Sequence, residues 1–293
     1  MPRLSIRHAT TYHYDAPVPY GLQQLRLVPK SRAGQRVVEW DTRVEGGGIE
    51  TEFDDEHANR VQLVSIDAEA TEVTVIAKGM VEVEDRQGVI GEHGGYMPLW
   101  MFLRPTPRTR RGPHLAALAR PLRGQEDQLA QMHALSAAVR EAVAYATGTT
   151  DVTMTAEDAM EAGTGVCQDH AHIFVAAARL LDRPARYVSG YLHMDGQDDQ
   201  DATHAWAEAH VDGLGWVGFD VSNGISPDAR YVRVATGLDY SDAAPIHGLR
   251  LGSAGESMSV ALRVSRGQRQ SQSQGGQAQS QSQGAHAQHA QQQ

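Results

Sequence analysis

The sequence predicts an α+β protein in which an antiparallel β domain precedes a core that mixes helices and strands. Apolar and polar residues alternate from residue 3 to about residue 84, the pattern of strands with one buried face. Apolar residues then recur at spacings of three and four between residues 114 and 147, as in amphipathic helices. A further helix followed by three short strands is expected between residues 167 and 221, which completes the α+β class.

These patterns divide the chain into four expected segments. Residues 1–87 form the β domain, in which proline and glycine residues separate the alternating runs as turn or bulge residues do. Residues 88–113 are rich in Gly, Pro and Arg, and their apolar patch around Trp100 is typical of an irregular crossover pressed onto a neighbouring domain. Residues 114–265 form the mixed core. Residues 266–293 form a Gln-, Ser- and Gly-rich tail with too little apolar surface to offset the entropy of ordering, so we expect it to be disordered.

Within the mixed core, local signals indicate where each element begins and ends. Gly148 is placed to stop the second helix, and Thr155 with Asp158 forms a capping box at the start of a short third helix. A long helix should run from Cys167 to Leu181, where the sequence Asp-Arg-Pro ends it. The three strands are expected at residues 185–194, 203–211 and 216–221.

Composition disfavours several classes of partner. The formal net charge is -10, the pI is about 5.7, and no basic stripe with interleaved aromatic residues occurs, so we expect neither nucleic acid nor an anionic membrane surface as partner. No run of about eighteen apolar residues could span a bilayer. With one cysteine, and an N-terminus that alternates instead of forming the apolar stretch of an export signal, a cytoplasmic protein is expected. The oligomeric state is left open.

Cys167 is the single cysteine, and its surroundings carry the chemistry. It cannot form an intramolecular disulfide, which leaves a buried spectator, a metal ligand or a nucleophile. The N-terminus of a helix favours the reactive thiolate, because unpaired amides and the helix dipole there stabilise negative charge. Gly163 and Gly165 allow a sharp turn before Cys167, whose N–H would serve as one oxyanion donor. Candidates for the second donor are Gln168, Trp100 and Tyr145.

His204 and Asp220 are the candidate base and orienting carboxylate. Alternation places His204, Trp206 and Glu208 on one face of their strand. If this strand and the next form a hairpin with a four-residue loop, Asp220 falls on the opposite face from His204. A three-residue loop or a bulge instead places Asp220 opposite Trp206, diagonal to His204 and on its face, so we predict this odd register. Trp206 would then flank the pair and reduce its access to water.

These three side chains predict a thiol-dependent acyl transfer. Cys167 would attack a carboxamide carbon, His204 would take the thiol proton and return it to the leaving amine, and Asp220 would fix the imidazole tautomer. Water would resolve the thioester by hydrolysis, or an amine by transamidation. Nothing in the chain marks a lysine-binding tunnel, which favours hydrolysis of peptide-like bonds. The expected partner is a peptide or protein substrate, and no cofactor is expected.

Four motifs carry a family resemblance: Gly-Val-Cys-Gln-Asp-His-Ala-His around Cys167, Ala-Arg-Tyr-Val-Ser-Gly-Tyr-Leu from Ala185, Thr-His-Ala-Trp-Ala-Glu from Thr203, and Gly-Leu-Gly-Trp-Val-Gly-Phe-Asp from Gly213. Together with the N-terminal β region, they resemble the bacterial transglutaminase-like proteins, which have a papain-type core. The resemblance covers nearly everything but the tail. It implies an N-terminal β-sandwich, a triad of Cys167, His204 and Asp220, and the activity of a transglutaminase or a cysteine peptidase. Where such relatives commonly have Asp-Pro-Thr-Asn, this chain has Asp-Val-Ser-Asn, a change that spares the triad.

Other polar and aromatic residues around the predicted triad receive weaker assignments. The candidate substrate-binding residues are Gln168, Trp206 and Tyr191, and Glu208 would either line the same cleft or form a paired strand carboxylate. The remaining histidines of this region are expected in the core, on the helix surface or at the rim: His170, His172, His193 and His210. Asp239, Tyr240 and Asp242 belong to a motif shared with the relatives, and the sequence assigns them no physical role.

The alternatives are two metal sites and a function without turnover. Cys167 and His170, three residues apart, could bind zinc with His204, but a second cysteine or a His-Glu-x-x-His motif is missing. The acidic run over residues 195–201 could bind calcium but lacks EF-hand spacing, so a solvated loop and no metal site are expected. The alternative function is a protein- or peptide-binding scaffold with a papain-like fold. The presence of all three catalytic residue types favours the enzyme.

Overall fold

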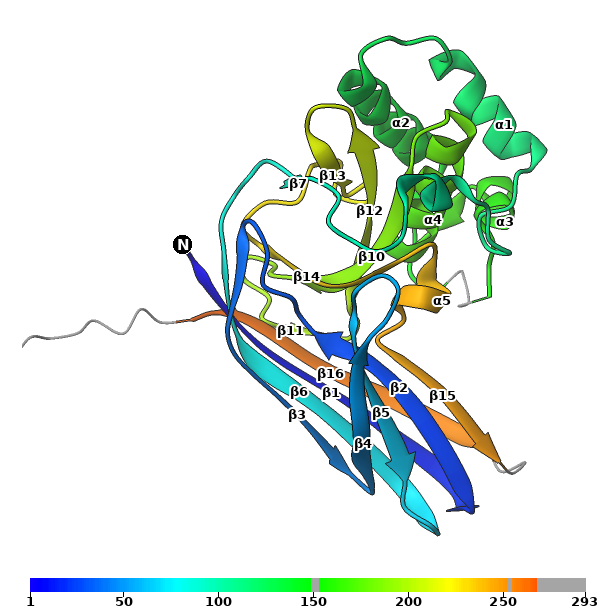
Figure 1. Ribbon diagram of the computed structural model, residues 1–293. Coiled ribbons are helices and arrows are strands. Elements are labelled where there is room, and N and C mark those ends of the chain that lie inside the picture. Colours follow the sequence, from blue (N-terminus) through cyan, green and yellow to red (C-terminus); the bar gives the residue numbers. More distant parts are fainter. Residues whose placement is uncertain (149–152, 252–254, 268–293) are drawn as a thin grey trace, which may run out of the picture.

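The alternating residues of the first segment form long strands that build a two-sheet sandwich (Figure 1). The computed structural model describes residues 1–148, 153–251 and 255–267. The strands of this segment are β1 (Arg3–Val18), β2 (Tyr20–Val28), β3 (Gln35–Glu45), β4 (Gly47–Asp54), β5 (Arg60–Ile66) and β6 (Ala70–Val83). Alternate side chains such as Leu25, Val64 and Val75 are almost completely buried between the two sheets. The expected antiparallel β module is therefore confirmed.

Two strands from the far end of the described chain complete the sandwich. β16 (Glu256–Arg266) pairs with β1, and β15 (Ile246–Leu251) pairs with β2. The sheet orders are β11-β16-β1-β6-β3, in which β11 is Asp199–Gln200, and β15-β2-β5-β4. We expected residues 114–265 to form one core, and this expectation is wrong for β15 and β16. Local alternation identifies a strand but not its sheet, and these two strands depart from the tendency to pair with sequence neighbours.

A third sheet carries the mixed core, in the order β14-β10-β12-β13-β7. Its strands are β7 (Val89–Gly91), β10 (Ala185–Leu192), β12 (His204–Val211), β13 (Gly215–Phe219) and β14 (Tyr231–Gly237), and all pair antiparallel. The three predicted strands are confirmed, with ends shifted by one or two residues. Small side chains on one face of β12, among them Ala207 and Ala209, let the long helix α4 (Cys167–Leu180) pack closely on the sheet.

The remaining helices surround α4 on the side away from the sandwich (Figure 1). They are α1 (Pro113–Ala119), η2 (Arg120–Leu122), α2 (Gln128–Ala142) and α3 (Ala156–Ala162), whereas α5 (Tyr240–Ala243) follows β14. The predicted capping box is confirmed, because the Asp158 N–H donates to the Thr155 hydroxyl and the Thr155 N–H donates to the Asp158 carboxylate. The prediction that Gly148 stops the second helix is wrong. Helix α2 ends at Ala142 because the chain then extends into β8 (Ala144–Tyr145), which pairs in parallel with β9 (Thr164–Gly165).

The crossover between sandwich and core contains β7 and the short helix η1 (Leu99–Leu103). Phe102 is buried, with its ring 5.0 Å from that of Trp216, whereas Trp100 remains 61% exposed. Arg179 of α4 anchors this segment by donating to the Phe102 carbonyl and the Thr109 hydroxyl. The tail that we expect to be disordered lies, from residue 268 onward, outside the described residues. In the part of the chain that the structure describes, no helix combines the length and the apolar character needed to cross a bilayer.

The sandwich and the core share a continuous apolar contact. Leu4, Ile6 and Val264 of the sandwich pack against Val232 and Val234 of β14. The core sheet thus has helices on one face and the sandwich, with its connecting loops, near the other (Figure 1). The candidate catalytic residues lie where β12 and β13 meet the N-terminus of α4.

Candidate active site

The approach to Cys167 depends on two glycines. Gly163 ends α3 with a φ of 67°, the left-handed conformation that glycine adopts without a steric penalty. At Gly165, a Cβ would lie 2.8 Å from Cβ of Asp169, so a larger residue has no room. Asp169 accepts a hydrogen bond from the Val166 N–H at 2.9 Å, which closes the first turn of α4. Cys167 is the first residue of this helix, so its N–H has no partner in the helical ladder.

The β12–β13 hairpin has the predicted odd register. Val211 pairs with Gly215 across a three-residue loop, and Ala207 pairs with Phe219. The next position therefore sets Asp220 opposite Trp206 and diagonal to His204. This geometry brings the carboxylate and the imidazole into contact: His204 Nε2 lies 2.6 Å from Asp220 Oδ2.

Asp220 is completely buried, and its charge is held by three donors besides the backbone. Oδ2 receives hydrogen bonds from His204 at 2.6 Å, from the Asn223 amide at 2.7 Å and from the Tyr231 hydroxyl at 2.7 Å. The backbone N–H of Asn223 donates to Oδ1 at 3.2 Å. Burial raises the pKa of Asp220, but these hydrogen bonds, led by that of His204, hold the pKa below its usual range. Asp220 is therefore an ionised, oriented carboxylate.

His204 contacts both Asp220 and Cys167. Because Nε2 faces Asp220, Nδ1 is the ring nitrogen left for the Cys167 side chain. Burial lowers the pKa of His204, but the hydrogen bonds and charges of Asp220 and Cys167 outweigh burial and raise it to about 10. The imidazole is thus protonated at neutral pH. Trp206 is 2% exposed and stacks on the His204 ring, with centroids 6.2 Å apart, so it shields the pair from water as predicted.

Sequence reasoning missed Asn223 and Tyr231. Asn223 closes the Asp-Val-Ser-Asn motif, three residues after Asp220, and that spacing was an available signal because a side chain there can fold back onto the carboxylate. Tyr231 begins β14, which is separated from β12 by β10, so no local spacing connects it with Asp220.

The candidate oxyanion donors differ in how the structure places them. Tyr145 pairs with Gly165 just upstream of Cys167, and its ring lies 6.1 Å from that of His170. Burial, and the charges of Cys167 and Asp220, raise the pKa of Tyr145, so the phenol stays neutral next to the site. Gln168 is the half-buried second residue of α4, and Trp100 projects from η1 with most of its surface exposed.

The structure does not bring Tyr191 to the predicted substrate cleft. Its side chain is 1% exposed, its hydroxyl is hydrogen-bonded to His8 Nδ1 at 3.1 Å, and its ring stacks on Trp40 of the sandwich. Its apolar neighbours, among them Leu4 and Val232, come from the sandwich and from β14, and the sequence of β10 alone does not indicate these contacts. Trp206 packs on His204 with almost no exposed surface, whereas Gln168 keeps a half-buried place beside Cys167.

Glu208 is a paired strand carboxylate and does not line the cleft. It is fully buried and contacts Arg186 at 2.6 Å and Arg233 at 2.5 Å. The charges of these arginines hold its pKa at about 2 although burial raises it.

His170 and His172 are core histidines: His170 contacts Ser222 and the Val143 carbonyl, and His172 accepts a hydrogen bond from the Tyr240 N–H.

Neither metal hypothesis finds a cluster of ligands. Across residues 1–148, 153–251 and 255–267, no group of three or more His, Cys, Asp or Glu side chains is arranged to hold a metal ion. Carboxylates of the acidic run instead pair with β16, as in Asp195 with Arg266 at 3.1 Å.

The motif around Tyr240 has a structural role. Asp239 caps α5, and Asp242 lies 3.2 Å from His57 of the sandwich.

Comparisons with known proteins agree with this architecture. The model of the transglutaminase-like superfamily matches residues 116–221, which include Cys167, His204 and Asp220, and that of the bacterial transglutaminase-like N-terminal region matches residues 4–82. An uncharacterised protein of Mycobacterium leprae is 28% identical over 279 residues, covering 91% of this chain and 99% of that protein. One from Mycobacterium tuberculosis (strain H37Rv) is 37% identical over 115 residues, 36% of this chain and 37% of that protein.

Among solved structures, a proposed cysteine protease of Cytophaga hutchinsonii has the same fold. Its TM-score is 0.72 at 24% sequence identity, with 90% of each chain covered. The match spans both the sandwich and the core, so the α+β architecture with a helix packed on an antiparallel sheet is common to the two proteins.

Proposed function

Because the chain belongs to the transglutaminase-like superfamily and carries a bacterial transglutaminase-like N-terminal region, we propose that it is an enzyme that cleaves peptide or protein carboxamides through a thioester on Cys167. The observation that carries the proposal is the line of contacts from Asp220 through His204 to Cys167 at the start of α4. This order matches the needs of a thiol nucleophile, its base and the group that orients the base.

In the proposed mechanism, the Cys167 sulfur attacks the carboxamide carbon while the thiol proton resides on His204. The carbonyl oxygen becomes an oxyanion, which the N–H of Cys167 and the neighbouring Tyr145 phenol or Gln168 amide stabilise. The carbon–nitrogen bond then breaks, and the imidazolium gives its proton to the leaving amine. Water next attacks the thioester with His204 as base, the carbon–sulfur bond breaks, and a carboxylic acid and the free thiol result.

Hydrolysis is the favoured outcome, and transamidation by an amine is the alternative fate of the same thioester. The experiment that separates them incubates the protein with a glutamine peptide and a labelled primary amine, using Cys167→Ala as control. Ammonia or cleavage without label uptake supports hydrolysis, and label uptake supports transamidation. If the wild type and Cys167→Ala both release nothing over a panel of peptides, the protein acts as a binding scaffold.

We also propose a cytoplasmic location, because a thiol nucleophile has to stay reduced and the chain contains a single cysteine. Cell fractionation with a compartment marker tests this placement. Recovery in an extracytoplasmic fraction would contradict it.

A further inference from the structure

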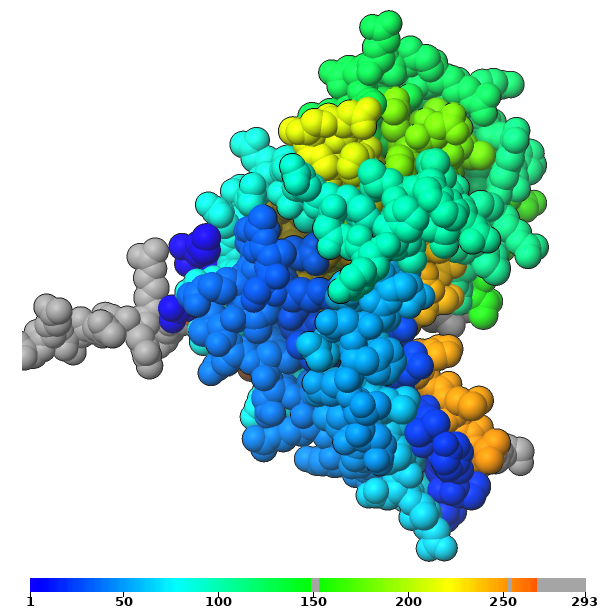
Figure 2. Space-filling view, viewed as in Figure 1, coloured from blue at the N-terminus to red at the C-terminus, as the bar shows by residue number. Residues whose placement is uncertain are grey.

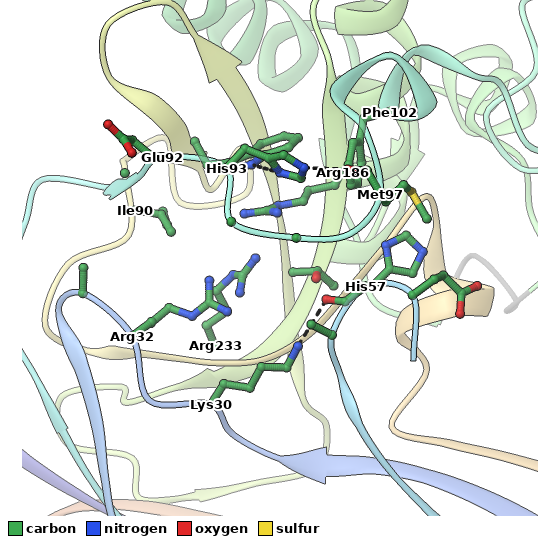
Figure 3. A pocket seen from close by; sticks show the side chains of 18 of the residues that line it. Lys30, Arg32, His57, Ile90, Glu92, His93, Met97, Phe102, Arg186 and Arg233 are labelled. Carbon is green, nitrogen blue, oxygen red and sulfur yellow. Dashed lines mark hydrogen bonds between the residues drawn. The ribbon is translucent and has the colours of Figure 1, made fainter. Parts of the chain in front are cut away.

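A cavity between the sandwich loops and the core sheet is lined by cationic side chains that the proposed reaction does not use. Its volume is about 380 Å³, within the range of small-molecule sites. Lys30, Arg32, Arg186 and Arg233 reach it from the β2–β3 connection and from strands β10 and β14. Figure 3 shows their head groups turned toward one space beneath the backbone that follows His93. In Figure 2 a recess separates the N-terminal loops (blue) from the crossover (cyan to green) on this side.

The charges around this cavity are not balanced. Glu208 is bonded to both Arg186 and Arg233, so one carboxylate already serves two guanidinium groups. Among the described residues, no carboxylate lies within 4.0 Å of Lys30 or Arg32. Lys30 donates to the carbonyl oxygen of His57 at 3.2 Å, and the buried Nε of Arg32 has no hydrogen-bond partner in the described chain. Two cations are therefore left without a counter-ion.

Burial makes this surplus of charge costly. It lowers the pKa of Lys30 to about 7, assisted by the charges of Arg233 and Arg32 and only partly opposed by Asp55 and Asp54. Burial and the charge of Arg233 also lower the pKa of Arg32, and the charge of Glu208, which already pairs with Arg186 and Arg233, only partly opposes them. Lys30 and Arg32 are half-buried, and unpaired charges away from water are costly unless a ligand or an ion completes them. The exposed acids Glu56 and Glu92 line only the rim, and Figure 3 shows the Glu92 carboxylate turned away from the cations.

We propose that this cavity binds a small molecule through a doubly charged oxyanion group, either a phosphate or a pair of carboxylates. A dianion matches the two cations without a counter-ion, and the planar fork of Arg32 suits two oxygens of such a group. Phe102, Met97 and Trp216 form an apolar wall on the crossover side, which accommodates the uncharged part of the ligand. Arg186 lies 3.8 Å from the centre of the Trp216 ring, so the wall and the cationic cluster are in contact.

This site is separate from the proposed thiol chemistry. Glu208 follows His204 by four residues on the same face of β12, which corresponds to roughly 13 Å along the strand. None of the residues lining the cavity is Cys167, His204 or Asp220. Ligand binding and turnover can therefore be tested independently.

Isothermal titration of the full chain at low salt provides the test. Inorganic phosphate, glycerol 3-phosphate and succinate serve as probes, and acetate at matched ionic strength is the singly charged control. We expect at least one of the three dianions to bind about tenfold or more tightly than acetate. Preference for a phosphate probe or for succinate tells which oxyanion the site takes, and either result supports the proposal.

Matched variants locate the binding. Arg32→Ala should weaken it about tenfold or more, as should Lys30→Gln, which covers the case that Arg32→Ala does not fold. Arg43→Ala changes an exposed arginine of β3 and should leave affinity unchanged, and Cys167→Ala should retain binding whether or not the thiol proposal holds. Failure of all three dianions to bind, or equal binding by wild type, Arg32→Ala and Lys30→Gln, would overturn the proposal.

Discussion

Two buried charge clusters lie four residues apart on β12, and they are built in different ways. Around His204, one carboxylate receives three side-chain donors, and the imidazole reaches on to Cys167. Around Glu208, one carboxylate serves two arginines while Lys30 and Arg32 add positive charge nearby. The first cluster is saturated around its anion, and the second has a surplus of cations.

The two arrangements suit different tasks. A carboxylate held by three donors has a fixed orientation, so the His204 ring that it contacts is held in one direction, as acid–base catalysis requires. A surplus of cations next to a cavity has no such orienting effect, and it is the basis of the anion site that we propose. In these proposals β12 contributes to the thiol chemistry near its start and to ligand recognition near its middle.

Removing the Cys167 sulfur should abolish the chemistry proposed for the first cluster and leave the second cluster intact. Cys167→Ala should reduce turnover on the order of 10⁴-fold or more, because the nucleophile is lost, while the far-ultraviolet circular dichroism and the melting temperature stay close to wild type. Initial rates of ammonia or peptide release measure the effect. Turnover retained by Cys167→Ala would refute the thiol assignment.

A second variant breaks the Glu208 cluster. Glu208→Gln leaves Arg186 and Arg233 buried without their carboxylate, and the free energy of unfolding should fall by about 3–5 kcal/mol. The matched control, Asp41→Asn, breaks an exposed ion pair with Arg43. It should change the free energy of unfolding by about 0.5 kcal/mol or less. Urea unfolding followed by tryptophan fluorescence compares the two. Equal stabilities would show that the Glu208 cluster does not hold the core together.

A third variant tests the coupling of Asp220 to His204. Asp220→Asn should lower turnover by about 10²–10⁴-fold and move the alkaline limb of the pH–rate profile down from about 10, because Asp220 raises the pKa of His204. The stability of the fold should also fall as pH rises. The His204 pKa exceeds its ordinary 6.5, so the contact between His204 and Asp220 stabilises the fold fully below pH 6.5 and progressively less as pH rises through about 10. An unchanged alkaline limb in Asp220→Asn would contradict this coupling.

The smallest change in turnover is expected at Tyr231, which belongs to the first cluster. Tyr231→Phe removes one of the three side-chain donors to Asp220 and should reduce turnover on the order of tenfold. Tyr191→Phe is the matched control, since this tyrosine is also buried but is hydrogen-bonded to His8. Its turnover should stay within about twofold of wild type. Similar losses in both variants would indicate a general packing effect instead of a role at Asp220.

Much of the fold could be predicted from the local alternation of apolar and polar residues, and the contact between His204 and Asp220 from the register of the β12–β13 hairpin. Alternation predicted the strands of the sandwich, and the loop length between Val211 and Gly215 decided whether Asp220 could meet His204. What local pattern could not supply were contacts between distant segments. Strands β15 and β16 return to the sandwich, and Tyr231 reaches Asp220 from a strand that is not the neighbour of β12.

The cationic cavity shows the same limit more strongly. Lys30, Arg186 and Arg233 lie far apart in the chain, and each alone is typical of a solvated surface residue. Tyr191 shows the same limit, because its ring stacks on Trp40 of the sandwich, a contact that spacing along β10 does not predict. Sequence spacing is informative within one hairpin or one helix turn, and it loses this value where three segments meet.

The decisive measurement is the rate of Cys167 alkylation by iodoacetamide, followed by mass spectrometry at pH 7 in wild type and His204→Ala. If His204 activates the Cys167 sulfur, the wild type should be alkylated about tenfold or more faster than His204→Ala. Equal rates in the two proteins would show that His204 does not activate the sulfur.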